Sequence, residues 1–454
     1  MIESTEIINE DILGRYKRIL NTFDSTFMFH KSVIVEEVVK EIKPTSVYLI
    51  GSFGRDEGSF RVSGETINPV RDYDILIVVD KGVKSDVIKR IRKNIHKRLR
   101  LPDPYSKEFK FRGFSVWITQ ETLKNINELP MLKFYELKKA SKLLWGKDVR
   151  ESISISFEDL SLYNGILILF GKIEGLLGFL NIDALRRERS QEQAVDFVYE
   201  CMKTYIEIGT CLSLLAKMYE PSFLGRCYRL SRNFETLFPE LKQMSDTLPS
   251  SMLIYAYKRL LIEDGYLNSL DLAKLLIQTL KDLRIAIWYY VHKAYEVNMA
   301  YSPTSPAVID DYVKKLDKRV LQDLFDYHLK VKLGFHSKIF RELAIRFYLR
   351  YTLLMFFAKA RKKGYRIKPG VIFMRNGNIM MKLWSLGFML LNSVKHDFKI
   401  DERVFYTTTC KLQQIVIKRC LSKEKPKLRF SYLRRITLDL LDLADKVFHR
   451  KLEY

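Results

Sequence analysis

The stretch that decides the fold runs from Val47 to Val79 and reads VYLIGSFGRDEGSFRVSGETINPVRDYDILIVV. Its first four residues are an apolar run of strand length, and Gly51 and Ser52 follow that run at once. A second β-branched run closes the stretch, and Asp72 and Asp74 stand just before it. The pattern predicts a strand, a tight Gly-Ser turn, a short helix, a long loop and a second strand.

The two aspartates are typical of a metal site. Residues i and i+2 of a strand point to the same side, so Asp72 and Asp74 are expected to aim at one point. Two carboxylates on one face repel each other unless a cation offsets their charge. Hard oxygen ligands suit Mg²⁺, which usually takes one or two carboxylates together with substrate phosphates. The pair therefore predicts a Mg²⁺ site, with Mn²⁺ as an alternative ion.

The Gly-Ser turn has the features that a phosphate group requires. Gly51 allows the backbone to approach a ligand, and Ser52 offers a hydroxyl and a backbone N–H at the start of a helix, where an anion is favoured. Arg55 is close enough in sequence to reach the same phosphates, which a guanidinium binds bidentately. An arginine on a solvated helix face is the alternative interpretation of Arg55.

This combination resembles the nucleotidyltransferase superfamily of the DNA polymerase β type. The signature of that family is a hydrophobic residue before Gly-Ser, a spacer, and Asp-x-Asp flanked by hydrophobic residues; here it is IGS at 50–52 and DYDI at 72–75. The resemblance covers residues 45–150, about a quarter of the chain. It implies that the Gly-Ser turn and Arg55 bind the phosphates of an NTP, and that the two aspartates hold the metal and carry the catalysis.

One position departs from the family's pattern. The family places a third carboxylate on the strand after a basic helix, and the matching position in Phe114–Trp117 is Ser115. Three interpretations follow from this difference. Another acid substitutes, Glu108 or Glu121 being the nearest; the enzyme works with the two aspartates alone; or the chain binds a nucleotide without transferring it.

The rest of the chain predicts an α+β protein, a small mixed-sheet domain followed by mostly helical domains. Two amphipathic helices, residues 6–20 and 31–42, are expected before the first strand, and the spacer from Glu57 to Val70 is expected to be a hairpin insertion or a mobile flap, with the insertion favoured. The predicted domains are N-terminal helices packing on the catalytic domain over 1–44, the nucleotidyltransferase domain over 45–150, a helical domain over 151–297, and a mainly helical basic domain over 309–454, after a linker at 298–308.

Several segments are strongly basic. The helix expected over Lys84–Arg100 has Asp86 as its one acid, and the segments 359–368 and 411–435 interleave basic and aromatic residues. This pattern suits contacts to nucleic-acid phosphates and single-stranded bases, with a solvated face as the alternative. The candidate nucleic-acid-binding residues are Lys89, Arg92, Lys93, Arg361, Lys362 and Lys363.

Composition favours a polyanionic partner. The 454 residues carry 77 lysines and arginines against 54 acids, a formal net charge of +23 that is spread along the chain. Such a surface attracts nucleic acid, nucleotides or acidic membranes, although a generally lysine-rich proteome gives the same balance. The five cysteines lack zinc spacing, and the most apolar stretch, residues 162–180, carries polar side chains. We therefore expect reduced thiols, a cytoplasmic location and no membrane segment.

These features predict a Mg²⁺-dependent nucleotidyltransferase that moves an NMP from an NTP to an acceptor hydroxyl while pyrophosphate leaves. The positive charge favours RNA or another nucleic acid as acceptor; a small molecule, such as an aminoglycoside or a sugar phosphate, and a protein side chain are alternatives. Ser115 supports a different class, a non-catalytic relative that binds a nucleotide or nucleic acid. A helical nucleic-acid-binding protein with a small α/β module is the third hypothesis.

Overall fold

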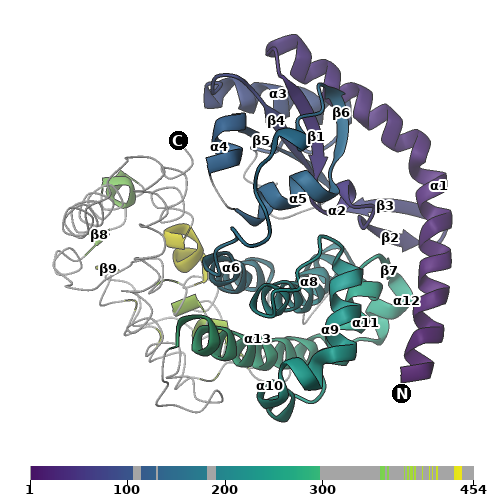
Figure 1. Ribbon diagram of the computed structural model, residues 1–454, viewed down its shortest axis with the longest axis vertical. Helices are drawn as coiled ribbons and strands as arrows, with labels where there is room; N and C mark the ends of the chain where they lie inside the picture. Colours follow the sequence, from purple (N-terminus) through teal and green to yellow (C-terminus); the bar gives the residue numbers. More distant parts are fainter. Residues whose placement is uncertain are drawn as a thin grey trace. The chain divides into compact units, whose positions relative to one another are not determined.

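The computed structural model describes residues 2–105, 114–128, 131–180 and 191–296, and short stretches between 358 and 441. Over these residues the chain is an α+β protein (Figure 1), as predicted. Its two compact units are Met1–Asn164 with Arg189–Leu270 (unit 1), and Gly165–Glu188 with Asp271–Tyr454 (unit 2). The segment predicted as one helical domain, 151–297, is thus divided between the units. The predicted linker, 298–308, lies outside the described residues.

Unit 1 is built on a four-stranded mixed sheet with the strand order β5-β4-β1-β6. The strands are β1 (Ser46–Ile50), β4 (Asp72–Val78), β5 (Ser115–Glu121) and β6 (Lys142–Gly146). Strand β1 is antiparallel to both β4 and β6, whereas β4 and β5 are parallel. Strand β4, which carries the two aspartates, is therefore central, and β5 and β6 are the edges of this sheet.

The long spacer of the opening stretch forms a hairpin, which confirms the expected insertion. Its strands β2 (Ser59–Ser63) and β3 (Thr66–Val70) are antiparallel and meet at a turn in which Gly64 has a φ of +58°. Strand β7 (Leu261–Glu263) pairs in parallel with β2. This pairing joins a segment from far along the chain to the hairpin, which explains why residues 189–270 belong to unit 1.

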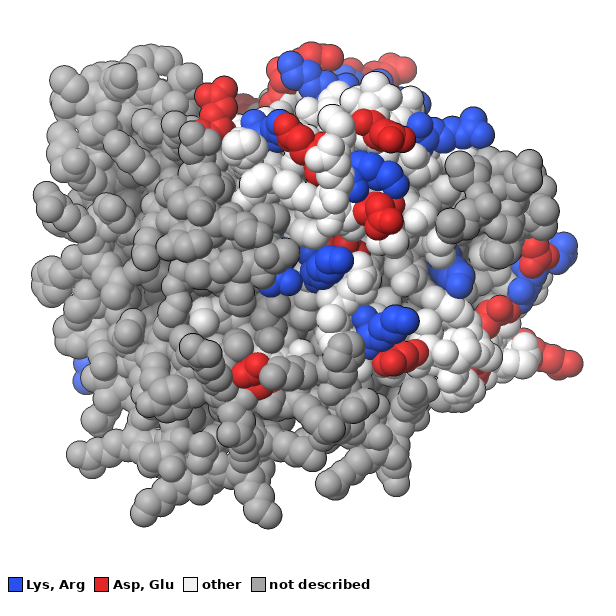
Figure 2. Space-filling view, turned by 90° about the horizontal axis from the view of Figure 1, so that it is seen from below, with Lys and Arg blue, Asp and Glu red and all other residues white. Residues whose placement is uncertain are grey.

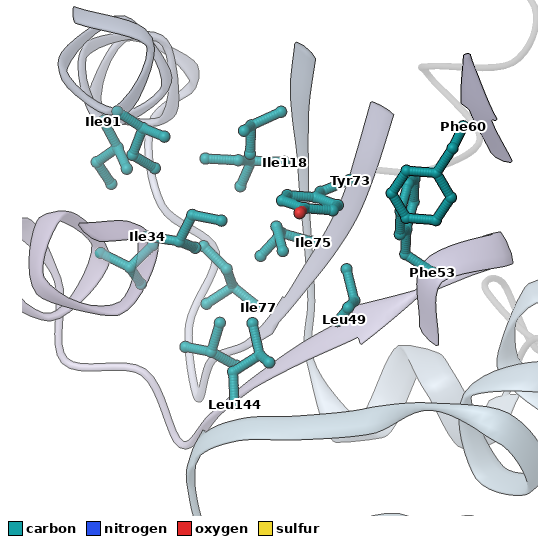
Figure 3. Close-up of a cluster of buried hydrophobic side chains, with 14 of the residues drawn as sticks. Ile34, Leu49, Phe53, Phe60, Tyr73, Ile75, Ile77, Ile91, Ile118 and Leu144 are labelled. Atoms are coloured by element: carbon teal, nitrogen blue, oxygen red, sulfur yellow. The ribbon is translucent and has the colours of Figure 1, made fainter. Parts of the chain in front are cut away.

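One face of the four-stranded sheet is covered by α1 (Ile2–Glu41) and α3 (Ser85–Arg98). Figure 3 shows the core between the sheet and these helices, in which Ile75 and Ile77 of β4 belong to the same cluster as Ile34 of α1 and Ile91 of α3. The alternation along β4 buries every second residue in this core and leaves the two aspartates on the opposite face.

The expectation of two N-terminal helices was wrong, because α1 is one continuous helix. Its apolar stripe does not stop after residue 20. Leu20, Phe23 and Phe27 are partly buried against the same core that Ile34 and Val38 enter. Helical spacing is therefore maintained through the segment between the two predicted helices, and continuous burial favours one helix.

The remaining elements of unit 1 are α2 (Gly51–Gly54), α4 (Leu123–Glu128), α5 (Leu132–Ala140), the 3₁₀ turn η1 (Arg150–Ser152), α8 (Gln191–Leu215), α9 (Phe223–Leu237), α10 (Pro239–Met244), α11 (Leu248–Lys258) and α12 (Asp264–Ser269). Helices α8, α9 and α11 pack against one another. The cysteines described in these helices, Cys201, Cys211 and Cys227, are buried. They contribute apolar volume to this helical layer.

Unit 2 contains all but the first two residues of α6 (Tyr163–Phe179), together with α13 (Leu272–Tyr295) and the short strands β8 (Arg366–Ile367) and β9 (Val416–Ile417). Helices α6 and α13 pack closely at Gly165, where an added Cβ would lie 2.3 Å from the Tyr290 ring. Arg434 donates hydrogen bonds to three carbonyls at the end of α6, which satisfies groups that a helix terminus leaves unpaired. No helix within the described parts of the chain has the length and apolar character to cross a membrane.

Candidate active site

Strand register brings the Gly-Ser turn (Gly51 and Ser52) against the aspartate pair (Asp72 and Asp74). Asp74 lies opposite Ile50, the last residue of β1, so the turn that follows Ile50 meets the Asp74 carboxylate. A Cβ added at Gly51 would lie 2.2 Å from Asp74 Oδ2, and Gly51 has a φ of +67°. Only glycine fits at this position without displacing the carboxylate.

The aspartate pair carries unbalanced negative charge. The pKa of Asp74 is raised to about 8, first by burial and then by the charge of Asp72, against which Lys203 and Arg55 act. Neither carboxylate forms an ion pair with any residue that the structure describes. Near neutral pH the pair therefore retains a proton unless a cation joins it.

The donor set of the pair fits a divalent cation with oxygen ligands. Two adjacent carboxylates suit Mg²⁺ or Mn²⁺, which complete their shells with water and phosphate oxygens. Among the described residues, no group of three or more His, Cys, Asp or Glu side chains is placed to hold a metal. Among the described residues, Asp72 and Asp74 are therefore the candidate carboxylate ligands.

The strand beside the pair carries no third acid at the site. Ser115 of β5 lies directly opposite Asp72 in the parallel register, on the same face, and is buried. Glu121 does not substitute, because it lies opposite Val78, about 20 Å farther along at 3.3 Å per residue, and pairs with Lys133 at 3.1 Å. Glu108 lies outside the described residues.

The Gly-Ser turn leaves one polar group available. The carbonyl of Ser52 accepts hydrogen bonds from the backbone N–H groups of Arg55 (3.2 Å) and Glu57 (2.9 Å), which stabilise the turn. The Ser52 hydroxyl makes no hydrogen bond with any described residue, and the side chain is only partly buried. It can therefore donate to a phosphate oxygen.

Arg55 lies in a buried group of charges that we call the Arg55 cluster: Arg55, Glu57, Glu136, Arg226 and Arg259. The Arg55 guanidinium is 2.8 Å from Glu136 and 3.7 Å from Glu57, and its side chain is only 4% exposed. Its carbon Cζ lies 4.1 Å from the centre of the Phe223 ring. These contacts assign Arg55 to the packing of α9 on the turn, so we leave it out of the proposed phosphate site.

Glu57 joins the same cluster to the start of α9. Its carboxylate accepts hydrogen bonds from Ser222 Oγ (2.8 Å) and from the backbone N–H groups of Phe223 (2.8 Å) and Leu224 (3.0 Å). Its backbone carbonyl accepts one from Arg259 at 2.8 Å. A carboxylate at a helix N-terminus satisfies unpaired donors and favours the helix dipole.

Arg71 and residues of helix α8 lie near the pair, and sequence reasoning did not select them. Arg71, the residue before Asp72, has a φ of +79°, pairs with Glu200 at 2.7 Å and lies over the Tyr199 ring. Lys203 is one turn farther along α8. Burial acts to lower the Lys203 pKa, but Tyr199, Glu207 and Glu200 outweigh that effect, so the ammonium stays charged. Tyr199, Lys203 and Glu207 stand at i, i+4 and i+8 along α8, so the sequence could have placed them on one face of the helix. Any amphipathic helix has such a spacing, so it does not by itself indicate a site.

Two arginines of the basic helix α3 pair with acids of α1. Arg98 pairs with Glu36 and Glu37, and Arg90 pairs with Glu41 at 2.7 Å. The acids that pair with Arg90 and Arg98 come from another helix, so the sequence of α3 alone does not reveal these ion pairs. In the view of Figure 2, basic and acidic side chains are interspersed on the described surface.

The candidate nucleic-acid-binding residues lie in different environments. Lys89 and Lys93 are exposed, with weak partners in Asp86 (3.1 Å) and Asp103 (3.7 Å). Arg92 is not part of this surface, because it is buried and its Nε donates to the Val116 carbonyl at 2.8 Å. Arg361 and Lys362 are exposed on a short helical stretch of unit 2, and Lys363 lies outside the described residues.

No protein-family model, curated protein or solved structure matched the chain. The likeness to the nucleotidyltransferase superfamily therefore depends on the motif and on the geometry of the aspartate pair and the turn.

Proposed function

We propose that the chain is a metal-dependent nucleotidyltransferase that transfers an NMP from an NTP to an acceptor hydroxyl. The observation that carries the proposal is the contact between the two halves of the motif. The Asp74 carboxylate lies against Gly51, beside a carboxylate partner and without an ion pair among the described residues. Such a site favours a bound cation, and its glycine lets the Asp74 carboxylate lie directly against the turn that would hold the phosphates.

The chain's own residues would divide the work between binding and orientation. Ser52 and the backbone of the turn bind the phosphates, and Asp72 and Asp74 hold the metal. The acceptor hydroxyl loses its proton to water and its oxygen forms a bond to the α-phosphorus, while the bond from the α-phosphorus to the bridging oxygen breaks and pyrophosphate departs. A bound Mg²⁺ or Mn²⁺ would polarise the phosphoryl oxygens and offset the charge of the entering and leaving groups. Lys203 contributes positive charge near Asp74.

The experiment measures pyrophosphate release from each of the four NTPs, with Mg²⁺ or Mn²⁺, in the presence and absence of total cellular RNA. Release that requires the metal and is lost in Asp72→Asn and Asp74→Asn supports the proposal and identifies the nucleotide. Asp24→Asn is the matched control, because Asp24 is an exposed aspartate of α1. Full release by Asp74→Asn would contradict the assignment of the site.

A second candidate function is nucleotide binding without transfer. Ser115 in place of a third acid and the charge of Lys203 near Asp74 favour this alternative, since the lysine partly fulfils the role of a cation. It predicts NTP binding that Asp74→Asn weakens, with no pyrophosphate released under any of the conditions above. Adding small hydroxylated acceptors and a protein extract to the same assay distinguishes this function from an enzyme that lacks its acceptor.

A further inference from the structure

An exposed tryptophan lies beside the aspartate pair. Trp117 of β5 is opposite Asp74 in the parallel register, so its side chain leaves the sheet on the same face as the carboxylates. The neighbouring residues Val116 and Ile118 point into the core on the other face. Trp117 is nevertheless 41% exposed, whereas tryptophan is highly buried on average.

Helix α3 holds the strand that carries this indole. Strand β5 is an edge, and two side chains of α3 satisfy its outward backbone groups: the Val116 N–H donates to His96 Nε2 (3.1 Å), and the Val116 carbonyl accepts from Arg92 Nε (2.8 Å). The Arg92 guanidinium then lies over the Trp117 ring, with Cζ 4.3 Å from its centre, and 5.5 Å from the centre of the Tyr105 ring. The edge is thereby protected from pairing with another strand, and the indole is held in place.

One side of the indole remains available. Because Arg92 occupies one face of the ring, the exposed area belongs to the opposite face and the rim. Burial lowers the pKa of Arg92, while Tyr105 and Asp72 act to raise it, which places the guanidinium within electrostatic range of the aspartate pair. Arg92, which the sequence suggested as a phosphate contact, thus acts as a support for Trp117.

If the proposed function is right, the in-line geometry of the reaction indicates which ligand lies on the β5 side of the aspartate pair. In a displacement at phosphorus, the attacking and leaving oxygens are roughly in line. The Gly-Ser turn, which would hold the leaving pyrophosphate, lies on the β1 side of β4. The acceptor hydroxyl would therefore arrive from the opposite side, where β5 carries Ser115 and Trp117.

We propose that Trp117, supported by Arg92, is the stacking platform for the terminal base of a single-stranded nucleic-acid acceptor. A flat, exposed indole binds any base through its π-face, which is how proteins hold single strands. Neither an amino sugar nor a sugar phosphate has an aromatic face for this contact. The net charge of +23 supports a polyanionic acceptor.

The test measures binding of the full chain to a fluorescently labelled oligonucleotide of about eight nucleotides, without NTP or metal, as RNA and as DNA of one sequence. Trp117→Ala is expected to weaken binding about tenfold, and Trp117→Phe, which keeps an aromatic face, by less than about threefold. The control is Trp145→Ala, because Trp145 is 39% exposed on β6, the opposite edge of the same sheet. It is expected to bind like the wild type. Equal affinities of wild type and Trp117→Ala, or equal losses in both alanine variants, would overturn the proposal.

A modified oligonucleotide makes the test independent of folding defects in the variants. Removing only the 3′-terminal base should weaken binding to the wild type about as much as Trp117→Ala does, and should have little further effect on Trp117→Ala. If the abasic oligonucleotide binds the wild type as tightly as the intact one, the terminal base does not stack on Trp117. The RNA and DNA arms show whether a 2′-hydroxyl is also recognised.

Failure of this inference can be told apart from failure of the proposed function. Binding that depends on Trp117 and the terminal base, but without pyrophosphate release from any NTP, supports the platform and contradicts transfer. Metal-dependent release that Asp74→Asn abolishes, but without binding that depends on Trp117, supports transfer and contradicts the platform. In the second case the acceptor belongs to another chemical class.

Discussion

Two groups of charges lie next to the turn after β1, and they differ in how their charges are balanced. In the Arg55 cluster, Glu136 lies 2.8 Å from Arg55, and Glu57 accepts hydrogen bonds from three donors at the start of α9. In the aspartate pair, Asp72 and Asp74 lie against each other, and neither forms an ion pair with a described residue.

The difference distinguishes charges that hold the fold from charges that await a ligand. Buried acids with cations and N–H donors are compensated within the protein, so removing one of them is strongly destabilising. In the aspartate pair, burial and the charge of Asp72 raise the Asp74 pKa to about 8, and the nearby charges of Lys203 and Arg55 offset this rise only in part. The comparison therefore predicts that changes in the Arg55 cluster reduce stability and that changes in the aspartate pair reduce activity.

The largest expected effect is on activity. Asp74→Asn removes one of the two carboxylates that would hold the metal, so we expect the rate of pyrophosphate release to fall about a hundred- to a thousandfold, the loss typical of one electrostatic group at a reaction centre. The melting temperature in metal-free buffer should not fall. A variant that loses activity only because it unfolds would contradict the comparison, and Asp24→Asn should match the wild type in both measurements.

The next effect is on stability and belongs to the Arg55 cluster. Glu57→Ala leaves Ser222 and two backbone N–H groups at the start of α9 without their acceptor. We expect the free energy of unfolding in urea to fall by about 3–5 kcal/mol, as for a broken buried charge network. Glu65→Ala, at the exposed tip of the hairpin, is the matched control. Similar stabilities of the two variants would show that the cluster does not support the fold.

A smaller effect concerns stability and pH. Because the folded-state pKa of Asp74 is about 8 and its ordinary value is near 4, the folded protein holds a proton that the unfolded chain has lost between these values. The contribution of Asp74 to the stability of the metal-free protein should therefore decrease from about pH 4 to about pH 8. At pH 8, Asp74→Asn should have a higher free energy of unfolding than the wild type, and the difference should vanish near pH 4. Urea titrations at the two pH values measure it.

Metal binding should stabilise the protein through the aspartate pair. Mg²⁺ at ten times its Kd would raise the free energy of unfolding by about 1.4 kcal/mol if it binds only the folded state. The gain should be larger at pH 8 than at pH 6, because the proton on the aspartate pair competes with the metal. Thermal unfolding with and without Mg²⁺ gives this shift. Asp72→Asn should show little of it, whereas Glu65→Ala should show it in full.

The smallest expected effect comes from restoring a third acid. Ser115→Asp places a carboxylate opposite Asp72 on the same face. It should lower the metal-free free energy of unfolding by about 1 kcal/mol through repulsion and should tighten Mn²⁺ binding. Calorimetric titration with Mn²⁺ measures the affinity, with Ser115→Ala as the control. Unchanged affinity in Ser115→Asp would show that β5 does not face the metal.

Much of the local structure could be predicted from the sequence. The α+β class and the hairpin between Glu57 and Val70 are confirmed by the structure. The two N-terminal helices were predicted wrongly, since the apolar stripe of α1 continues between them. Arg92 was predicted to contact nucleic acid, but it is buried and donates a hydrogen bond to the Val116 carbonyl at the edge of the sheet. Both errors come from contacts with distant elements, which a local pattern does not contain.

The sequence by itself determined that a glycine turn follows an apolar strand and that Asp72 and Asp74 share one face, because the period-2 alternation of a strand is local. Only the tertiary structure decided that Gly51 meets Asp74, that Arg55 turns to Glu136, and that Lys203 of α8 lies near the pair. The physical reason is that strand register and helix packing depend on the combined burial of many side chains. The charges near the aspartate pair are brought there by that packing and not by their own spacing along the chain.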